Sequence, residues 1–166
     1  MNTSTEINEF DAYDASILGA LQKDSRITMA QLGRLVHLSQ PAVTQRVRKL
    51  ELSGVITGYR AQVDYQRLGY GIRAVVRVGR AEYARIVKLV EQTPEVITAY
   101  NVTGDDSWVL QIAVIDVAHL DAVVTKFCVV TETATCIVLK ALRESAPVLP
   151  ARRDSIKPTI KKVTGR

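Results

Sequence analysis

Two short amphipathic helical patterns, separated by only three residues, constrain the fold of this 166-residue chain more than any other feature. The first pattern begins after Thr28, and Thr28 and Gln31 have the spacing of a capping box. The three residues 37–39 leave room only for a turn, and Ser39 is a suitable N-cap for the second helix. Pro41 fits the first turn of that helix, where a missing N–H costs little. Each helix is expected to bury one apolar stripe, formed by Met29, Leu32, Leu35 and Val36 in the first and by Val43, Val47 and Leu50 in the second.

The opposite side of the second helix carries polar and cationic side chains that suit the major groove of double-stranded DNA. Glutamine can pair with adenine through two hydrogen bonds, arginine can pair with guanine, and threonine can contact a thymine methyl group or a phosphate. This pattern predicts a helix-turn-helix whose second helix reads DNA. We expect base contacts from Gln40, Thr44, Gln45 and Arg48, and phosphate contacts from Arg26, Ser39, Arg46 and Lys49.

An ordinary helical hairpin with a solvated polar face is the alternative interpretation. Two observations favour DNA binding. The pattern at residues 14–22, with Ile17, Leu18 and Leu21, predicts the third helix that such a unit needs for its core. Residues 23–60 also carry seven cations against only Asp24 and Glu51. This local excess is relevant because phosphate contacts depend on nearby charge.

The net charge of +5 comes from the end of the chain and not from this segment. Residues 1–64 carry seven cations and seven anions, and residues 65–150 carry nine of each. The tail at residues 151–166 carries six cations against Asp154 and has few large apolar side chains, so we expect it to be disordered. Two interpretations of the tail stay open: a solvated segment without function, or a loose arm that adds sequence-independent affinity for phosphates.

Several classes of protein are not expected from this composition. No apolar run approaches the roughly 20 residues of a membrane span, and the first residues lack an export signal, so the cytoplasm is the expected location. Two histidines and the widely spaced Cys128 and Cys136 predict no metal site and no cofactor, and both cysteines are expected to be buried. An enzyme is not expected, because no nucleophile–base pair or phosphate loop is present.

The second half of the chain has the periodicities of a βαββαβ domain. The expected strands are residues 72–78, 96–102, 108–115 and 130–142, and the expected helices lie around residues 83–90 and 120–127. This order is the ferredoxin-like arrangement, so the chain as a whole is expected to be α+β. The expected domains are a winged-type helix-turn-helix domain at residues 10–64, with a short strand at 59–63, a linker at 65–71 and the βαββαβ domain at 72–145.

In a ferredoxin-like domain the helices cover only one face of the sheet. The other face would carry valine, isoleucine and tryptophan side chains, and a second copy of the same face is the simplest cover for it. We therefore expect a homodimer that forms through the second domain.

A set of short segments, in this order and spacing, resembles the Lrp/AsnC (leucine-responsive regulatory protein, or feast/famine) family. The segments are residues 14–18, 21–24, 26–28, 38–41, 46–51, 54–59, 94–96, 100–105 and 133–139. The resemblance implies a transcription regulator that binds DNA, forms dimers and assembles further into tetramers or octamers. It also implies a small-molecule effector, commonly an amino acid, at clefts between dimers. The positions carried over for the effector are Gly104, Asp105, Ser107, Thr133 and Thr135.

Two departures from the family pattern bear on the effector. Ser107-Trp108 stands where the family has an acidic residue followed by an aromatic one, and Cys128-Val129 replaces a common Pro-Gly. A serine offers no charge to an ammonium group, although Asp105 or Asp106 could take that function. A sequence-independent architectural DNA-binding protein without an effector is therefore the alternative function, and a simple hairpin loop is the alternative interpretation of the turn at residues 104–107.

Overall fold

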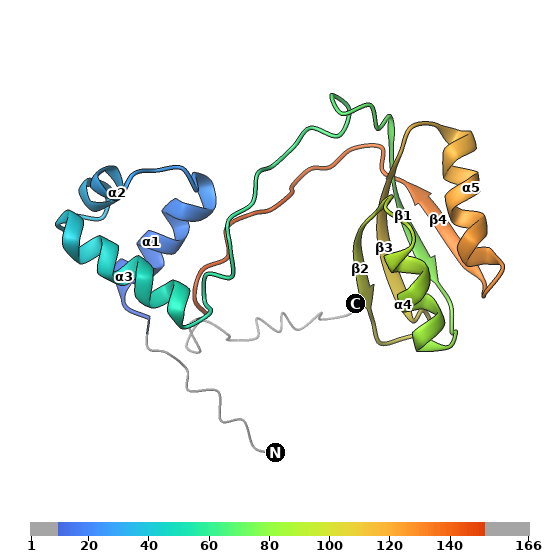
Figure 1. Ribbon diagram of the computed structural model, residues 1–166, viewed down its shortest axis with the longest axis horizontal. Coiled ribbons are helices and arrows are strands. Elements are labelled where there is room, and N and C mark those ends of the chain that lie inside the picture. The colour runs from blue at the N-terminus through green and yellow to red at the C-terminus, as the bar shows by residue number, and fades with distance from the viewer. Residues whose placement is uncertain (1–9, 152–166) are drawn as a thin grey trace, which may run out of the picture. The chain divides into compact units, whose positions relative to one another are not determined.

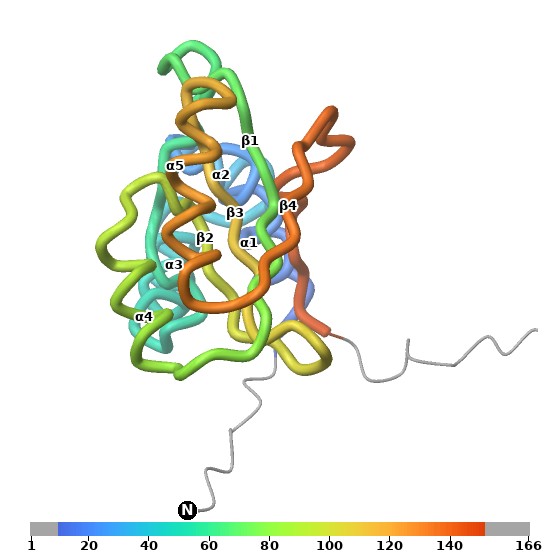
Figure 2. Tube along the Cα trace, turned by 90° about the vertical axis from the view of Figure 1, so that its right-hand side faces the viewer, coloured from blue at the N-terminus to red at the C-terminus, as the bar shows by residue number. Residues whose placement is uncertain are grey.

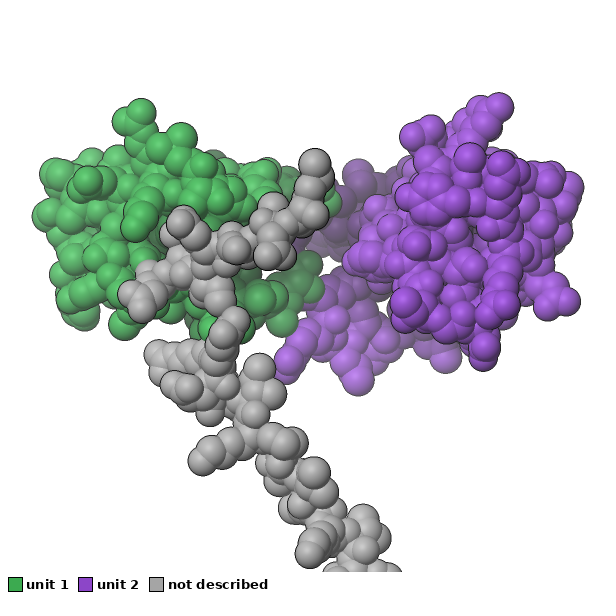
Figure 3. Space-filling model, turned by 90° about the horizontal axis from the view of Figure 1, so that it is seen from below, with its two compact units in different colours: residues 1–61, 145–166 green, residues 62–144 purple. Residues whose placement is uncertain are grey.

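The computed structural model describes residues 10–151, which form two compact units (Figures 1 and 3). The C-terminal unit is continuous and spans residues 62–144. The N-terminal unit combines residues 10–61 with residues 145–151, which follow the C-terminal unit in the sequence. The tail from residue 152, whose disorder the composition predicts, lies outside the described residues.

Three helices form the N-terminal unit, as the sequence predicts: α1 (Ala12–Lys23), α2 (Met29–Leu35) and α3 (Gln40–Leu52). The caps of α2 and α3 are the expected residues, because the Thr28 side chain accepts from the Gln31 N–H and the Ser39 side chain accepts from the Ala42 N–H. One buried cluster joins the three helices, with Ile17, Leu32 and Val43 fully buried. Leu35 was expected in this core but is 61% exposed, because it lines an open groove beside α1 and not the buried cluster.

The turn between α2 and α3 depends on Gly33. The Leu38 N–H donates to the Gly33 carbonyl at 2.8 Å, and His37 adopts a positive φ of 57° between them. A Cβ atom on residue 33 would lie 2.7 Å from the Leu38 carbonyl oxygen. The chain can therefore reverse this tightly only because residue 33 has no side chain.

The prediction of a strand at residues 59–63 is wrong. This segment follows Gly54, whose φ is 71°, and is extended, but it pairs with no strand among residues 10–151. Its alternating pattern predicted a half-buried strand, yet Tyr59 and Val63 are each about half exposed. Alternation alone does not supply the neighbouring backbone that a strand needs.

The C-terminal unit has the predicted βαββαβ order, and its antiparallel sheet has the strand order β2-β3-β1-β4 (Figure 1). Its elements are β1 (Ile72–Val78), α4 (Tyr83–Glu91), β2 (Val96–Asn101), β3 (Trp108–Val114), α5 (Val117–Cys128) and β4 (Thr133–Ile137). The strand β4 is shorter than the expected 130–142. Its start is delayed because the N–H groups of Val130 and Thr131 bond to the Phe127 carbonyl at the end of α5.

The helices α4 and α5 cover the same face of this sheet (Figure 2). Side chains on that face, among them Val76, Leu110 and Ile112, are at most 1% exposed and pack against Ile86 and Phe127. On the other face, which no helix or strand of residues 10–151 covers, the register places Val75, Arg77, Val109, Gln111 and Tyr100. Arg73 also lies on that face, but its guanidinium lies over the Tyr65 ring and pairs with Glu144. Trp108 does not lie on that face as expected, because it is 7% exposed in the core under the helices.

Both cysteines are exposed, so the expectation that they are buried is wrong. Cys136 pairs with Val75 in the register and thus lies on the uncovered face of the sheet. Cys128 ends α5, and its sulfur lies 2.9 Å from the Thr133 hydroxyl. No helix within residues 10–151 is long and apolar enough to cross a membrane.

Candidate nucleic-acid interface and effector turn

The helix α3 presents a continuous polar face above a buried apolar stripe. Val43, Val47 and Leu50 are at most 5% exposed, which fixes the rotation of the helix about its own axis. Burial of each such side chain stabilises the unit by about 1.5–3 kcal/mol. The residues expected to contact bases and most of those expected to contact phosphates are exposed: Arg26, Ser39, Gln40, Thr44, Gln45, Arg48 and Lys49.

Two of these side chains also make local hydrogen bonds at the start of α3. Ser39 accepts from the Ala42 N–H at 3.4 Å, so it contributes to the helix cap. The Thr44 hydroxyl donates to the Gln40 carbonyl at 2.8 Å, which leaves its methyl group and an acceptor lone pair available to a partner. Arg26 lies apart from α3, in the connection between α1 and α2.

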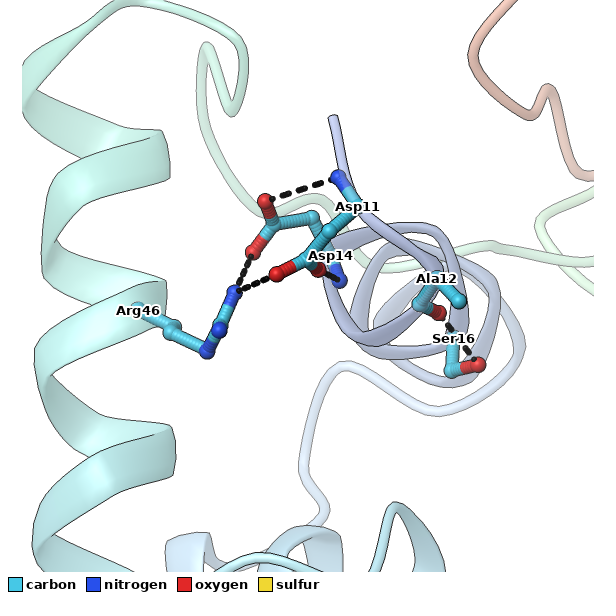
Figure 4. Close-up of polar contacts among 5 residues, drawn as sticks. All are labelled: Asp11, Ala12, Asp14, Ser16 and Arg46. Carbon is cyan, nitrogen blue, oxygen red and sulfur yellow. Dashed lines mark hydrogen bonds and ion pairs between the residues drawn. The ribbon is translucent and has the colours of Figure 1, made fainter. Parts of the chain in front are cut away.

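Arg46 differs from the other cations of α3 because it is engaged within the unit (Figure 4). Its Nη1 atom lies 2.7 Å from Asp11 Oδ2 and 2.8 Å from Asp14 Oδ1, and its guanidinium lies over the Tyr13 ring. The same two carboxylates form the capping box of α1. Arg46 thereby fastens α3 to the first turn of α1, which gives it a structural function beside the expected phosphate contact.

These ion pairs shift the protonation equilibria of their members. The Asp14 backbone N–H lowers the pKa of Asp11, and the Arg46 guanidinium lowers it further. Hydrogen bonds to Asp14 and Asp11 raise the pKa of Arg46. Asp11 and Arg46 are therefore charged at neutral pH. The spacing of Asp11 and Asp14 is the sequence signal that could have identified the cap, but it does not show which distant cation binds there.

The five residues expected to contact an effector lie in two places along the sequence. Gly104, Asp105 and Ser107 belong to the turn between β2 and β3, where Gly104 has a φ of 121°. Thr133 and Thr135 belong to β4. The sheet order places β1 between these two groups.

The end of β1 brings the two groups to the same end of the sheet. The Ser107 N–H donates to the Val78 carbonyl at 2.9 Å, and Val78 also pairs with Thr133 in the register. The backbone carbonyl of Ser107 accepts from Val102 and from the Asn101 side chain. The backbone N–H of Ser107 is thus engaged within the fold, and Gly104 and Asp105 are the exposed part of the turn.

An arginine that the sequence analysis did not single out lies beside this turn. Arg77 Nε is 2.6 Å from Asp106 Oδ2, and this hydrogen bond raises the pKa of Arg77. Asp106 is therefore already paired with a cation of β1. Asp105 is exposed, so it is the better placed of the two carboxylates to meet a cationic group.

The fold and these two sites define a class of protein: a DNA-binding transcription regulator with a separate ligand-binding domain. The AsnC-type helix-turn-helix domain matches residues 10–51, and the Lrp/AsnC ligand binding domain matches residues 73–148. The chain belongs to the Lrp/AsnC family of transcription regulators, which are not enzymes.

Individual relatives agree with this assignment. The chain is 31% identical over 136 residues to the HTH-type transcriptional regulator LrpC of Bacillus subtilis, covering 81% of this chain and 94% of the relative. It is 34% identical over 149 residues to the leucine-responsive regulatory protein of Rhizobium meliloti, covering 84% and 96%. The solved structure of B. subtilis LrpC superimposes with a TM-score of 0.77 and 30% identity, covering 81% of this chain and 98% of that one.

Proposed function

We propose that the regulator reads its DNA site through Gln40, Thr44, Gln45 and Arg48 and contacts phosphates through Arg26, Ser39 and Lys49. The observation that carries this proposal is the exposed polar face of α3, whose orientation is set by the buried stripe and by the ion pairs of Arg46. Side chains in the first half of a recognition helix reach base edges, and flanking cations contact the backbone. Arg46 acts as a positioning residue in this proposal.

Fluorescence anisotropy with a fragment of the regulator's own promoter tests the assignment. Gln45→Ala and Arg48→Ala should each weaken specific binding by about 1–3 kcal/mol if the side chain contacts a base. Lys88→Ala is the matched control for the removal of a charge, because Lys88 is an exposed cation on α4 in the C-terminal unit. A Gln45/Arg48 double variant that binds as tightly as the control would overturn the assignment. Equal affinity for promoter and random DNA would instead indicate a sequence-independent architectural protein.

We further propose that the regulator is a homodimer joined through the uncovered face of the sheet, and that dimers assemble into tetramers or octamers. Val75 and Val109 lie on this face beside polar side chains, as in other protein interfaces. A dimer would present two copies of α3 to half-sites about one helical turn apart. Light scattering of the wild-type chain and of Val109→Asp tests this, and a wild-type chain that stays monomeric would contradict it. We also propose a cytoplasmic location, which is consistent with a regulator of the DNA-binding Lrp/AsnC family.

For the effector we propose an amino acid, bound by Gly104, Asp105, Ser107, Thr133 and Thr135. Backbone N–H groups of a glycine-containing turn can hold a carboxylate, and Asp105 can accept from an ammonium group. Relatives named as leucine-responsive and glutamate uptake regulators agree with this chemical class. Calorimetry against a panel of amino acids tests the proposal. Asp105→Asn should weaken binding more than Asp106→Asn, because Asp106 is paired with Arg77. Absence of heat across the panel would contradict an amino-acid effector.

A further inference from the structure

The chain segment that follows β4 does not end on the C-terminal unit. Its last attachments there are the hydrogen bond from the Val138 N–H to the Arg73 carbonyl and the ion pair between Glu144 and Arg73. From residue 145 the chain belongs to the N-terminal unit. Two covalent connections therefore join the units: the segment after α3, and the segment after β4.

The returning segment is held by a pair of hydrogen bonds on α1. Gln22 Nε2 donates to the Val148 carbonyl at 2.8 Å, and the Val148 N–H donates to Gln22 Oε1 at 2.8 Å. A side-chain amide that donates to and accepts from one residue fixes that residue in both direction and register. The Val148 side chain takes no part in this contact and is 74% exposed.

The next residue, Leu149, lies on a groove formed by small side chains of α1. Its Cδ2 atom lies 3.5 Å from the place where a Cβ atom on Gly19 would stand, which is ordinary van der Waals contact. Leu149 is 57% exposed, whereas Leu139 and Leu142, earlier in the same segment, are 95% and 88% exposed. The contact is thus confined to the end of the segment. Besides Leu149, the groove is lined on α1 by Ala12, Ala15, Ser16, Gly19, Ala20 and Lys23, and at the end of α2 by Leu35 and Val36.

We infer that residues 145–150 are a strap that couples β4 to the recognition helix through α1. Thr133 and Thr135 lie on β4, the strap continues from β4 to Gln22 on α1, and Asp11 and Asp14 at the start of α1 hold Arg46 on α3. In this inference a change in β4 on effector binding reaches α1 along the chain that follows β4, and reaches α3 through the ion pairs of Arg46. The coupling rests on the proposed effector site and DNA-reading face, but the docking of the strap does not.

Hydrogen exchange of the full-length protein tests the docking. The Val148 amide should exchange at least tenfold more slowly than an unstructured amide, and Gln22→Ala and Leu149→Ala should each remove most of that protection. Val148→Ala is the matched control, because it leaves both backbone hydrogen bonds in place. The docking of the strap would be contradicted by an unprotected Val148 amide in the wild-type chain, or by an equal loss of protection in the Val148→Ala control.

Binding to the promoter fragment tests the coupling. The Gln22→Ala/Leu149→Ala variant should bind at least threefold more weakly than Val148→Ala, with an unchanged salt dependence because no charge is altered. Equal affinities would overturn the coupling even where the exchange experiment shows docking. Failure of the proposed DNA-reading function is distinguishable, since the wild-type chain would then not bind the fragment specifically, while the exchange experiment would still report on the strap.

Discussion

Replacement of Gly33 by alanine should destabilise the N-terminal unit, although alanine is the better helix former. The new Cβ atom would lie 2.7 Å from the Leu38 carbonyl oxygen, and contacts of this kind are not found below 3.0 Å, so the turn must open by at least about 0.3 Å. Overpacking of this kind costs about 1–3 kcal/mol. Weakening of the 2.8 Å hydrogen bond between Leu38 and Gly33 adds about 1 kcal/mol. The higher helix propensity of alanine stabilises the unit by about 1 kcal/mol, so the net destabilisation is about 1–3 kcal/mol.

Gly19→Ala is the matched control, because Gly19 also lies within a helix. Its Cβ atom would meet only Leu149 at 3.5 Å, so the gain in helix propensity, about 0.5–1 kcal/mol, should be retained. Hydrogen exchange of α3 amides in urea measures the N-terminal unit. Fluorescence of Trp108, the only tryptophan, follows the C-terminal unit and should be unchanged in both variants. A Gly33→Ala protein as stable as Gly19→Ala would refute the steric argument.

Charged and ionisable groups allow three further tests. The pKa of Asp11 is lowered in the folded chain, so its contribution to stability is present above about pH 4 and is lost as the pH falls through the lowered value. Acid unfolding of α3, followed by hydrogen exchange, should therefore be less steep in Asp11→Asn, and identical profiles would contradict the role of the ion pairs. Partial burial and the Glu51 carboxylate raise the pKa of Tyr59 to about 12, so stability should fall as the pH rises from about 10 through that value. An ultraviolet titration follows the ionisation of the six tyrosines, and Glu51→Gln should abolish the transition at the highest pH, which belongs to Tyr59. A single transition near pH 10 in the wild-type protein would contradict the raised pKa of Tyr59. Deletion of residues 152–166, with six cations and one anion, should reduce the salt dependence of DNA binding by about 0.9 for each phosphate that the tail neutralises and leave the preference for the promoter unchanged. An unaltered slope would favour a tail without function.

Local patterns in the sequence were sufficient for the helices and for the order of the strands. Thr28 and Ser39 mark helix starts through hydrogen bonds within a few residues. Pro41 marks the start of α3 because its fixed φ and missing N–H fit the first turn of a helix. These signals are therefore readable without tertiary structure. The α+β fold was predicted from the same short-range information, whereas the family was predicted from the resemblance of a series of segments, in their order and spacing, to a known family.

The errors arise where an outcome depends on distant partners. Leu35 and Cys136 have the residue types of a core, but both are exposed, because residue type alone does not show which element lies against a side chain. The alternation at residues 59–63 is typical of a strand, yet a strand also requires a neighbour. Arg46 looked like the other cations of α3, because its partner Asp14 lies 32 residues away.

The hydrogen bonds between Gln22 and Val148, which are 126 residues apart, also determine the order in which the protein folds during translation. The buried cluster of the three helices lies within residues 17–50 and can assemble while the rest is still being translated. The groove on α1 stays unoccupied until Val148 and Leu149 have been synthesised and have left the ribosome. A nascent chain, or one truncated before residue 148, would therefore have a folded N-terminal unit to which the strap is not docked.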